Sequence, residues 1–280
     1  MKIYRMIRYD MRQGFWQNRW KLLIMVALTL FFCADFYLYR SNCYRGKDVP
    51  QATYMDYLFY FMSGAKEYHV GVDETVPFPA KWFLLNAYFL YSTLYYSNRD
   101  LLGMGKVILP RAKSRWSWWL SKCVWNMLYT LCGYGVLYVT VLLWCVVMGE
   151  RVSFTITAPL IDKLLGMEGI HTEYAMMLSF YILLVPMMTV ISLSILQTMF
   201  SLITRPVFSF GIMAVIFVLS TYFQSSIFIG NYAMPIRSAY VIEGGFGLFG
   251  GIGWAVVICL LAMLVGGLCF QKYDMLAMEN

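Results

Sequence analysis

The sequence predicts an all-α polytopic membrane protein with six transmembrane helices. Hydrophobic residues make up 60% of the 280 residues, and only 13% of the residues are charged, against about 25% in a typical soluble domain. A soluble fold could not bury this much apolar surface, so we expect the excess to lie in lipid. A window of about twenty residues finds six apolar runs, with most of the charged residues in the segments between them.

The N-terminal segment 1–20 is predicted to be an amphipathic helix ahead of the first span. Apolar residues recur every four positions from Ile3 to Met11, while arginines line another face. This pattern is typical of a helix lying in the headgroup plane, and a plain basic flank without defined structure is the alternative. Trp16 and Trp20 follow, and we expect them to anchor the chain at the membrane interface.

Residues 21–280 are predicted to form one membrane domain. Its spans are expected near residues 21–39, 80–97, 117–148, 174–203, 207–229 and 248–270, with a cytoplasmic segment at 98–122 and outer loops at 40–79, 149–173 and 230–247. With the N-terminus inside, fourteen of the 22 lysines and arginines but only four of the 15 acidic residues lie on the inner side. The positive-inside rule therefore predicts a multi-pass plasma-membrane protein whose termini are both cytoplasmic.

The outer side carries three features of interest. The apolar stretch 54–62 is too short to span, so it is predicted to be an interfacial helix or a packed lid. The loop 230–247 has the character of a re-entrant segment. Asp35 is the one ionisable residue within a span, and a helix end at the interface is its simplest interpretation. Asp35 and Glu243 are nevertheless kept as a candidate outer gate.

The segment 98–122 is strongly basic and ends in tryptophans. Its six positive residues, against Asp100 alone as an acid, are Arg99, Lys106, Arg111, Lys113, Arg115 and Lys122. Trp116, Trp118 and Trp119 are predicted to anchor the third span at the interface. Simple anchoring explains much of this composition, and docking of a cytoplasmic partner would be an additional role.

The last span begins with a stripe of small residues. Gly247, Gly251, Ala255 and Cys259 recur every four positions. Small residues at that spacing let another helix approach closely, so we expect a helix-packing face here.

The chain has no P-loop, no metal-ligand motif and no complete catalytic motif: its one GxGxxG match, at 245–250, is not preceded by a predicted strand, and its SxxK match, at 63–66, lacks the partner motifs SDN and KTG. It has no GxxxxGK[ST] sequence, so ATP would have to be bound, with Mg²⁺, by a partner subunit. The cysteines and histidines lack metal-ligand spacing, and neither HExxH nor GxSxG occurs. No acid or base is expected near the membrane midplane, which disfavours a secondary carrier. The net charge of +7 lies beside the spans and fits a membrane surface rather than nucleic acid.

This layout resembles the permease subunits of type-2 ABC exporters. The resemblance rests on the six spans, on the helix ahead of the first span, and on the run Leu109-Pro110-Arg111-x-x-x-Arg115 leading to Lys122. It implies an ATP-driven exporter in which two permease copies, identical or different, pair above two cytoplasmic ABC ATPase subunits. It implies a coupling role, not a catalytic one, for Gly105, Lys106, Arg111, Arg115 and Lys122.

Methionine-rich and aromatic spans favour an amphipathic or hydrophobic substrate such as an antimicrobial peptide or a drug. The alternative function is a non-transporting sensor or assembly subunit of a resistance system. A membrane-embedded enzyme is a further alternative, although no convergent catalytic set is visible in the sequence.

Overall fold

The computed structural model describes residues 2–44, 49–66, 78–105, 109, 114–165 and 174–272. Within these ranges the chain is helical, and its only β contacts are two isolated bridges. Four of the described helices are long and apolar enough to cross a membrane. They are α1 (Lys2–Cys43), α6 (Arg115–Val147), α8 (Ala175–Ile203) and α10 (Leu248–Gln271). The described residues thus confirm the prediction of an all-α protein with several helices long and apolar enough to span a membrane.

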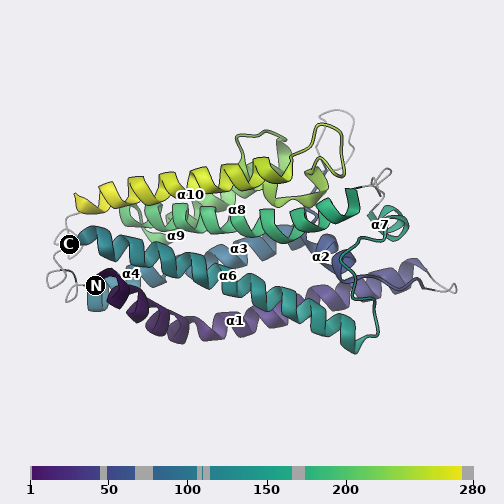
Figure 1. The fold of residues 1–280 in the computed structure, drawn as a ribbon, viewed down its shortest axis with the longest axis horizontal. Coiled ribbons are helices and arrows are strands. Elements are labelled where there is room, and N and C mark those ends of the chain that lie inside the picture. The colour runs from purple at the N-terminus through teal and green to yellow at the C-terminus, as the bar shows by residue number, and fades with distance from the viewer. Residues whose placement is uncertain are drawn as a thin grey trace.

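The long helices lie side by side in an elongated bundle (Figure 1). α10 packs along α8, and α1 packs along α6. The first residues of α1 and α6 and the last residues of α10 lie together at one end, which we call the terminal end (Figure 1). The opposite end, where α1 and α6 finish, is the distal end. The shorter helices that complete the bundle are α3 (Ala80–Leu94), α4 (Tyr96–Asp100) and α9 (Pro206–Tyr222).

α1 is one continuous helix, which differs from the expected break at residue 20. The helix runs without interruption from the N-terminal segment into the apolar stretch. It contains no proline, and its only glycine, Gly14, lies directly against the indole ring of Trp125 on α6. Because no residue interrupts the backbone hydrogen bonds, the N-terminal segment continues the axis of the first apolar stretch.

A tight turn separates α8 from α9. Thr204 and Arg205 have extended backbone angles, and Pro206 is the first residue of α9. Proline suits that position because its missing N–H has no helical acceptor there. α9 ends at Tyr222, short of the expected 229. The Asn231 amide donates hydrogen bonds to the carbonyl oxygens of Phe223 and Ser225, at 2.8 and 2.9 Å, and thereby stabilises a non-helical continuation.

The helix α2 (Tyr54–Met62) is a packed element of the distal end, and all nine of its residues are buried. Thr53 and Asp56 form a capping box at its start. The second oxygen of Asp56 accepts a 2.8 Å hydrogen bond from the backbone N–H of Thr157, in the segment that follows α6. Of the two alternatives for this stretch, the structure therefore shows the packed one.

Three short helices complete the distal end: α7 (Ala158–Leu165) and the 3-10 helices η3 (Ile229–Ala233) and η4 (Pro235–Arg237). Arg237, the last residue of η4, is fully buried. Its guanidinium donates to the carbonyl oxygens of Ala65, Lys66, Ser220 and Thr221 and to the side-chain oxygen of Asn231. Two of these carbonyls belong to the last turn of α9, where a cation also interacts favourably with the helix dipole.

A candidate coupling site at the terminal end of the bundle

Lys122 lies at the centre of a buried ion cluster at the terminal end. Its ammonium contacts the carboxylate of Asp10 and lies 2.6 Å from Oδ2 of Asp100. The exposed fractions of the Lys122, Asp10 and Asp100 side chains are 1%, 1% and 5%. We therefore correct the expectation that Lys122 offers its charge to a partner: its ammonium is enclosed by this chain's own acids.

The three charges come from three separate helices. Asp10 is on the N-terminal part of α1, Asp100 is the last residue of α4, and Lys122 lies two turns into α6. The cluster therefore joins a residue near each end of the basic segment 98–122, Asp100 and Lys122, to Asp10 on α1. Removing one member of such a buried pair typically costs about 3–5 kcal/mol, because the remaining charge loses its partner.

Neutral donors complete the cluster. The hydroxyl of Tyr96 donates a 2.8 Å hydrogen bond to Oδ1 of Asp10, and the indole N–H of Trp118 donates a 3.1 Å hydrogen bond to Oδ2 of Asp100. The other oxygen of Asp10, Oδ2, is buried and has no hydrogen-bond partner among the described residues. A small cavity of about 190 Å³ adjoins the cluster and is also lined by Arg5.

The chain turns sharply where it leaves the cluster. Residues Leu101–Gly105 form a single π-helical turn. Gly105 is buried, and a Cβ atom at this position would lie 2.7 Å from the carbonyl oxygen of Asp100. Only glycine allows this close approach of the two backbones. Gly105 therefore has a structural role: it allows the tight turn that follows Asp100.

Two members of the predicted coupling set, Lys106 and Arg111, lie outside the described residues. Leu109, between them, is described and is buried in a cluster with Trp118 and Phe270. One side chain of the basic segment thus packs into the terminal end of the bundle.

Arg115 connects the start of α6 to the end of α10. Its guanidinium donates a 2.7 Å hydrogen bond to the carbonyl oxygen of Gln271 and a 3.4 Å one to that of Phe270. A cation at a helix C-terminus is favourable because the last carbonyls lack helical partners. The structure thus places Arg115 in an intramolecular contact, in addition to any role toward a partner.

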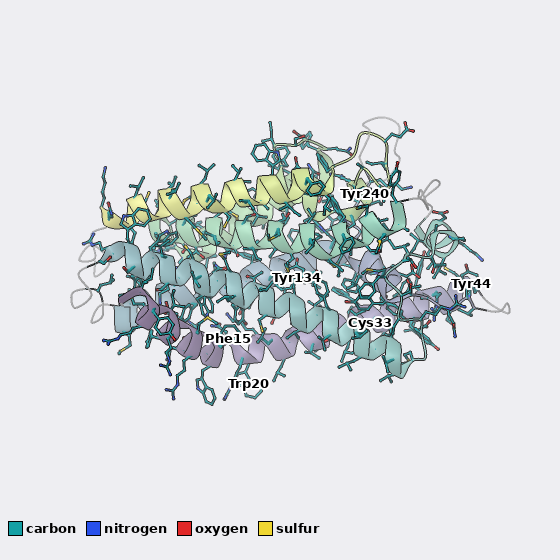
Figure 2. All side chains as sticks on the ribbon, viewed as in Figure 1. Phe15, Trp20, Cys33, Tyr44, Tyr134 and Tyr240 are labelled. Atoms are coloured by element: carbon teal, nitrogen blue, oxygen red, sulfur yellow. The ribbon has the colours of Figure 1, made fainter. Side chains whose placement is uncertain are left out.

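The five predicted interface tryptophans divide into two groups. Trp16 and Trp20 are 65% and 63% exposed on α1, and Figure 2 shows Trp20 projecting away from the bundle. Trp118 and Trp119 are buried, so they are interior packing residues rather than interface anchors. Trp116 is half-buried, and its ring lies directly against the backbone of Gly267 on α10.

Two glycines of α10 leave room for the tryptophan rings of α6. A Cβ atom at Gly266 would lie 2.2 Å from Cζ2 of Trp119, and one at Gly267 would lie 2.2 Å from Cζ3 of Trp116. The indole rings of α6 thus fill space that side chains on α10 would otherwise occupy. Trp118 stacks on Phe270, further along the same helix, with the two ring centroids 4.6 Å apart.

The small-residue stripe of α10 packs as expected over part of its length. Gly251 and Ala255 are buried, and a Cβ atom at Gly251 would lie 2.6 Å from a methyl group of Val185 on α8. Cys259 is half-buried. Gly247 differs from the expectation, because it is the N-cap of α10 and has open space around it.

The two candidate gate residues lie in different surroundings at the distal end. The carboxylate of Asp35 lies 2.6 Å from the ammonium of Lys81 and accepts a 3.0 Å hydrogen bond from the hydroxyl of Tyr60. Glu243 is exposed in the turn that precedes α10. Within the described part of the chain no hydrogen bond or ion pair joins Asp35 to Glu243.

Sequence reasoning missed Asp10 and Asp100 as members of a site. Each was counted only as one acid among many inner basic residues. A usable signal was present, because Asp10 is the only acid in the first twenty residues and Asp100 is the only acid in segment 98–122. A lone acid within a basic segment suggests a specific partner.

In the described residues no group of three or more histidine, cysteine or acidic side chains is arranged to hold a metal ion. In comparisons with known proteins, no protein-family model matches the chain, and neither a curated protein nor a solved structure does.

Proposed function

We propose that this chain is the transmembrane permease subunit of an ATP-driven ABC exporter. In this proposal the terminal end faces the cytoplasm, and α3 with α4 and α9 complete six crossings. The 21 residues from Ala80 to Asp100 would extend roughly 31 Å as helix, close to the thickness of a bilayer core. Separate ATPase subunits would bind below segment 98–122, and a second permease copy would pair in the membrane.

The observation that carries the proposal is the buried cluster of Asp10, Asp100 and Lys122. It fixes both ends of the basic segment to the N-terminal part of α1. A displacement of the segment would therefore move α1, α4 and α6 together. A coupling element needs this property, because the ATPase must favour one arrangement of the spans over another.

The roles within segment 98–122 divide between docking and transmission. Lys106 and Arg111 would supply positive charge to the ATPase, as the sequence resemblance implies. Lys122 and Gly105 would transmit movement, because both are enclosed within the chain's own structure. Arg115 would hold the start of α6 to the end of α10.

Copurification tests the proposal most directly. The tagged chain, expressed in its native cells and solubilised in a mild detergent, should bring down an ABC ATPase in stoichiometric amount. The double charge reversal Lys106→Glu with Arg111→Glu should reduce the recovered ATPase at least tenfold. Arg115 is left intact in this test, because its contacts with α10 would confound the result.

A matched control reverses two charges at the distal end. Arg151 and Lys163 are both exposed and basic, so the double variant Arg151→Glu with Lys163→Glu changes the net charge equally without touching the terminal end. It should retain the ATPase. Absence of any ATPase from the native complex would refute the proposal, and equal recovery with both double variants would reduce segment 98–122 to a membrane anchor.

The rate of ATP hydrolysis distinguishes transport from the alternative role as a sensor or assembly subunit. In an exporter complex reconstituted in lipid nanodiscs, hydrolysis should respond to an amphipathic substrate from a panel of antimicrobial peptides and drugs. A rate that no member of the panel changes would favour the non-transporting role.

A further inference from the structure

A long apolar groove lies between α1 and α6. It has a volume of about 750 Å³, within the roughly 300–1,000 Å³ of small-molecule sites. Its walls are almost wholly apolar and include Val26 and Leu30 from α1 and Val139 and Leu143 from α6. Gly135 also lines it, and a Cβ atom at Gly135 would meet no other atom within 4 Å. The groove is therefore open space that a side chain at this position would enter.

A polar pocket continues the groove at its distal end. The pocket has a volume of about 220 Å³ and is lined by Arg40, Ser41, Gln51 and Glu150. Met148 lines both the pocket and the groove, so the two cavities are neighbours. Together they form an elongated site that is apolar along most of its length and polar at one end.

Arg40, which lines the polar pocket, has one nitrogen without a hydrogen-bond acceptor. The two terminal nitrogens of Arg40 bind the carboxylate of Glu150, and the Arg40 side chain is 5% exposed. The third nitrogen of the guanidinium, Nε, is buried, and its N–H has no hydrogen-bond partner in the described structure. Glu150 is already engaged, since it also accepts a 2.9 Å hydrogen bond from the backbone N–H of Ala52. The Nε–H of Arg40 therefore lacks an acceptor oxygen.

The length of the site matches one leaflet of a bilayer. Val26 and Arg40 are fourteen residues apart on α1, which corresponds to roughly 21 Å along a helix. Half of a hydrocarbon core is about 15 Å thick, and the headgroup region adds several ångströms. A molecule with its polar end at Arg40 would therefore extend to about the middle of the membrane.

We propose that this site binds a glycerophospholipid of the distal leaflet. One acyl chain occupies the groove between α1 and α6, and a phosphate oxygen accepts a hydrogen bond from Nε–H of Arg40. Ser41 and Gln51 are placed to contact the rest of the headgroup. A packed helix of a second copy would fill the apolar groove, but its interior carbonyl oxygens already accept helical hydrogen bonds and would offer Arg40 no acceptor. The site is independent of ATPase coupling, because it lies at the other end of the bundle.

Photo-crosslinking in nanodiscs tests this site. The probe is a phosphatidylcholine that carries a diazirine near the end of one acyl chain, and labelled peptides are mapped by mass spectrometry. Because the polar end of the lipid lies at Arg40, labelling should concentrate at the other end of the groove, on residues 132–139 of α6 and residues 26–30 of α1. Gly135→Trp should reduce it at least fivefold, because the indole would fill the groove.

The matched control is Gly211→Trp on α9. A Cβ atom at Gly211 also meets no other atom within 4 Å, and Gly211 does not line the groove. This variant should leave groove labelling within twofold of the wild-type value. Labelling spread evenly over all lipid-facing helices, or equal loss with both tryptophan variants, would overturn the proposal.

Two further measurements test the headgroup contact and the competing occupant. Arg40→Lys retains the charge opposite Glu150 but lacks an Nε–H, so it should lower phospholipid retention in native mass spectra at least threefold. Equal retention, or replacement of the probe by a diazirine fatty acid with the same labelling pattern, would overturn the phosphate contact. Self-crosslinking of a Val139→Cys variant would assign the groove to a second copy instead.

Discussion

The indole ring of Trp119 lies against the backbone of Gly266, and a Cβ atom at Gly266 would lie 2.2 Å from Cζ2 of that ring. The indole N–H of Trp119 also donates a 2.7 Å hydrogen bond to the carbonyl oxygen of Met263, one turn earlier on α10. One tryptophan of α6 is thus held to α10 by both shape and hydrogen bonding. This contact explains why an aromatic cluster expected at the membrane interface lies partly in the interior.

Gly266→Ala should destabilise the protein by about 1–3 kcal/mol, because the new methyl group overlaps the Trp119 ring. Gly253→Ala on the same helix is the matched control, since a Cβ atom there meets no other atom within 4 Å. Thermal unfolding in detergent, followed by tryptophan fluorescence, compares the two. Equal unfolding midpoints would show that the indole moves aside at little cost.

Lys122→Met should lower stability by about 3–5 kcal/mol, because it leaves the carboxylates of Asp10 and Asp100 buried without their cation. Lys272→Met, which removes an exposed charge at the same end, should change stability by less than about 1 kcal/mol. Unfolding midpoints in detergent measure both effects.

A triple variant checks the physical reason for that loss. Asp10→Asn with Lys122→Met and Asp100→Asn removes all three charges, so it should recover part of the stability that Lys122→Met loses. A triple variant less stable than Lys122→Met would contradict an electrostatic origin and indicate a loss of packing.

Arg237→Met should destabilise the distal end by at least about 3 kcal/mol, because the carbonyl oxygens around the guanidinium would lose their donor. Limited proteolysis of segment 223–247 should become faster by at least tenfold. Arg151→Met is the control, because Arg151 is exposed and its guanidinium makes one side-chain hydrogen bond, to Gln51. Equal cleavage of both variants would contradict a structural role for Arg237.

The burial of Asp56 should make the stability of the protein depend on pH. Burial raises the pKa of its carboxyl above the ordinary 3.8, although hydrogen bonds from Thr53 and Thr157 act in the opposite direction. The folded state therefore holds this proton more tightly than the unfolded state does. The resulting stabilisation is fully present below about pH 4 and is lost as the pH rises through the folded-state pKa.

The comparison that isolates this effect is with Asp56→Asn. Between pH 4 and pH 7 the wild-type unfolding midpoint should fall relative to that of Asp56→Asn, because other titrating groups act equally on both proteins. A wild-type midpoint that rises relative to the variant would show that the hydrogen bonds from Thr53 and Thr157 outweigh the burial of the charge.

Hydropathy located most of the helices to within a few residues because the bilayer imposes a length on apolar runs. The predicted 117–148 and 174–203 correspond to α6 and α8. Hydropathy placed the end of α9 too late: the predicted span continues to residue 229, whereas the helix ends at Tyr222 and the amide of Asn231 holds the carbonyls of Phe223 and Ser225 in a non-helical continuation. A single side-chain contact of this kind has no signature in composition.

Only part of the candidate site could be predicted from the sequence. The basic segment 98–122 was evident from its charges, and Gly105 was named only through the family resemblance. The partners of Lys122 were not predictable, because Asp10 and Asp100 are separated by ninety residues and meet only when α1 and α4 both pack against α6. Trp118 and Trp119 were predicted to lie at the membrane interface but are buried. The sequence near them could not show this, because Gly266 and Gly267, which accommodate the rings of Trp119 and Trp116, lie far along the chain on α10.

The complete burial of α2 has a consequence for the order in which the protein assembles. Its nine residues pack against α1 and α3, but also against α6 and α8, which the ribosome makes later. At about 5–20 residues per second, α2 waits on the order of ten seconds for α8 to be synthesised. During that interval its apolar side chains have no completed pocket, so this segment is where a nascent chain most needs the membrane surface or a chaperone to shield it.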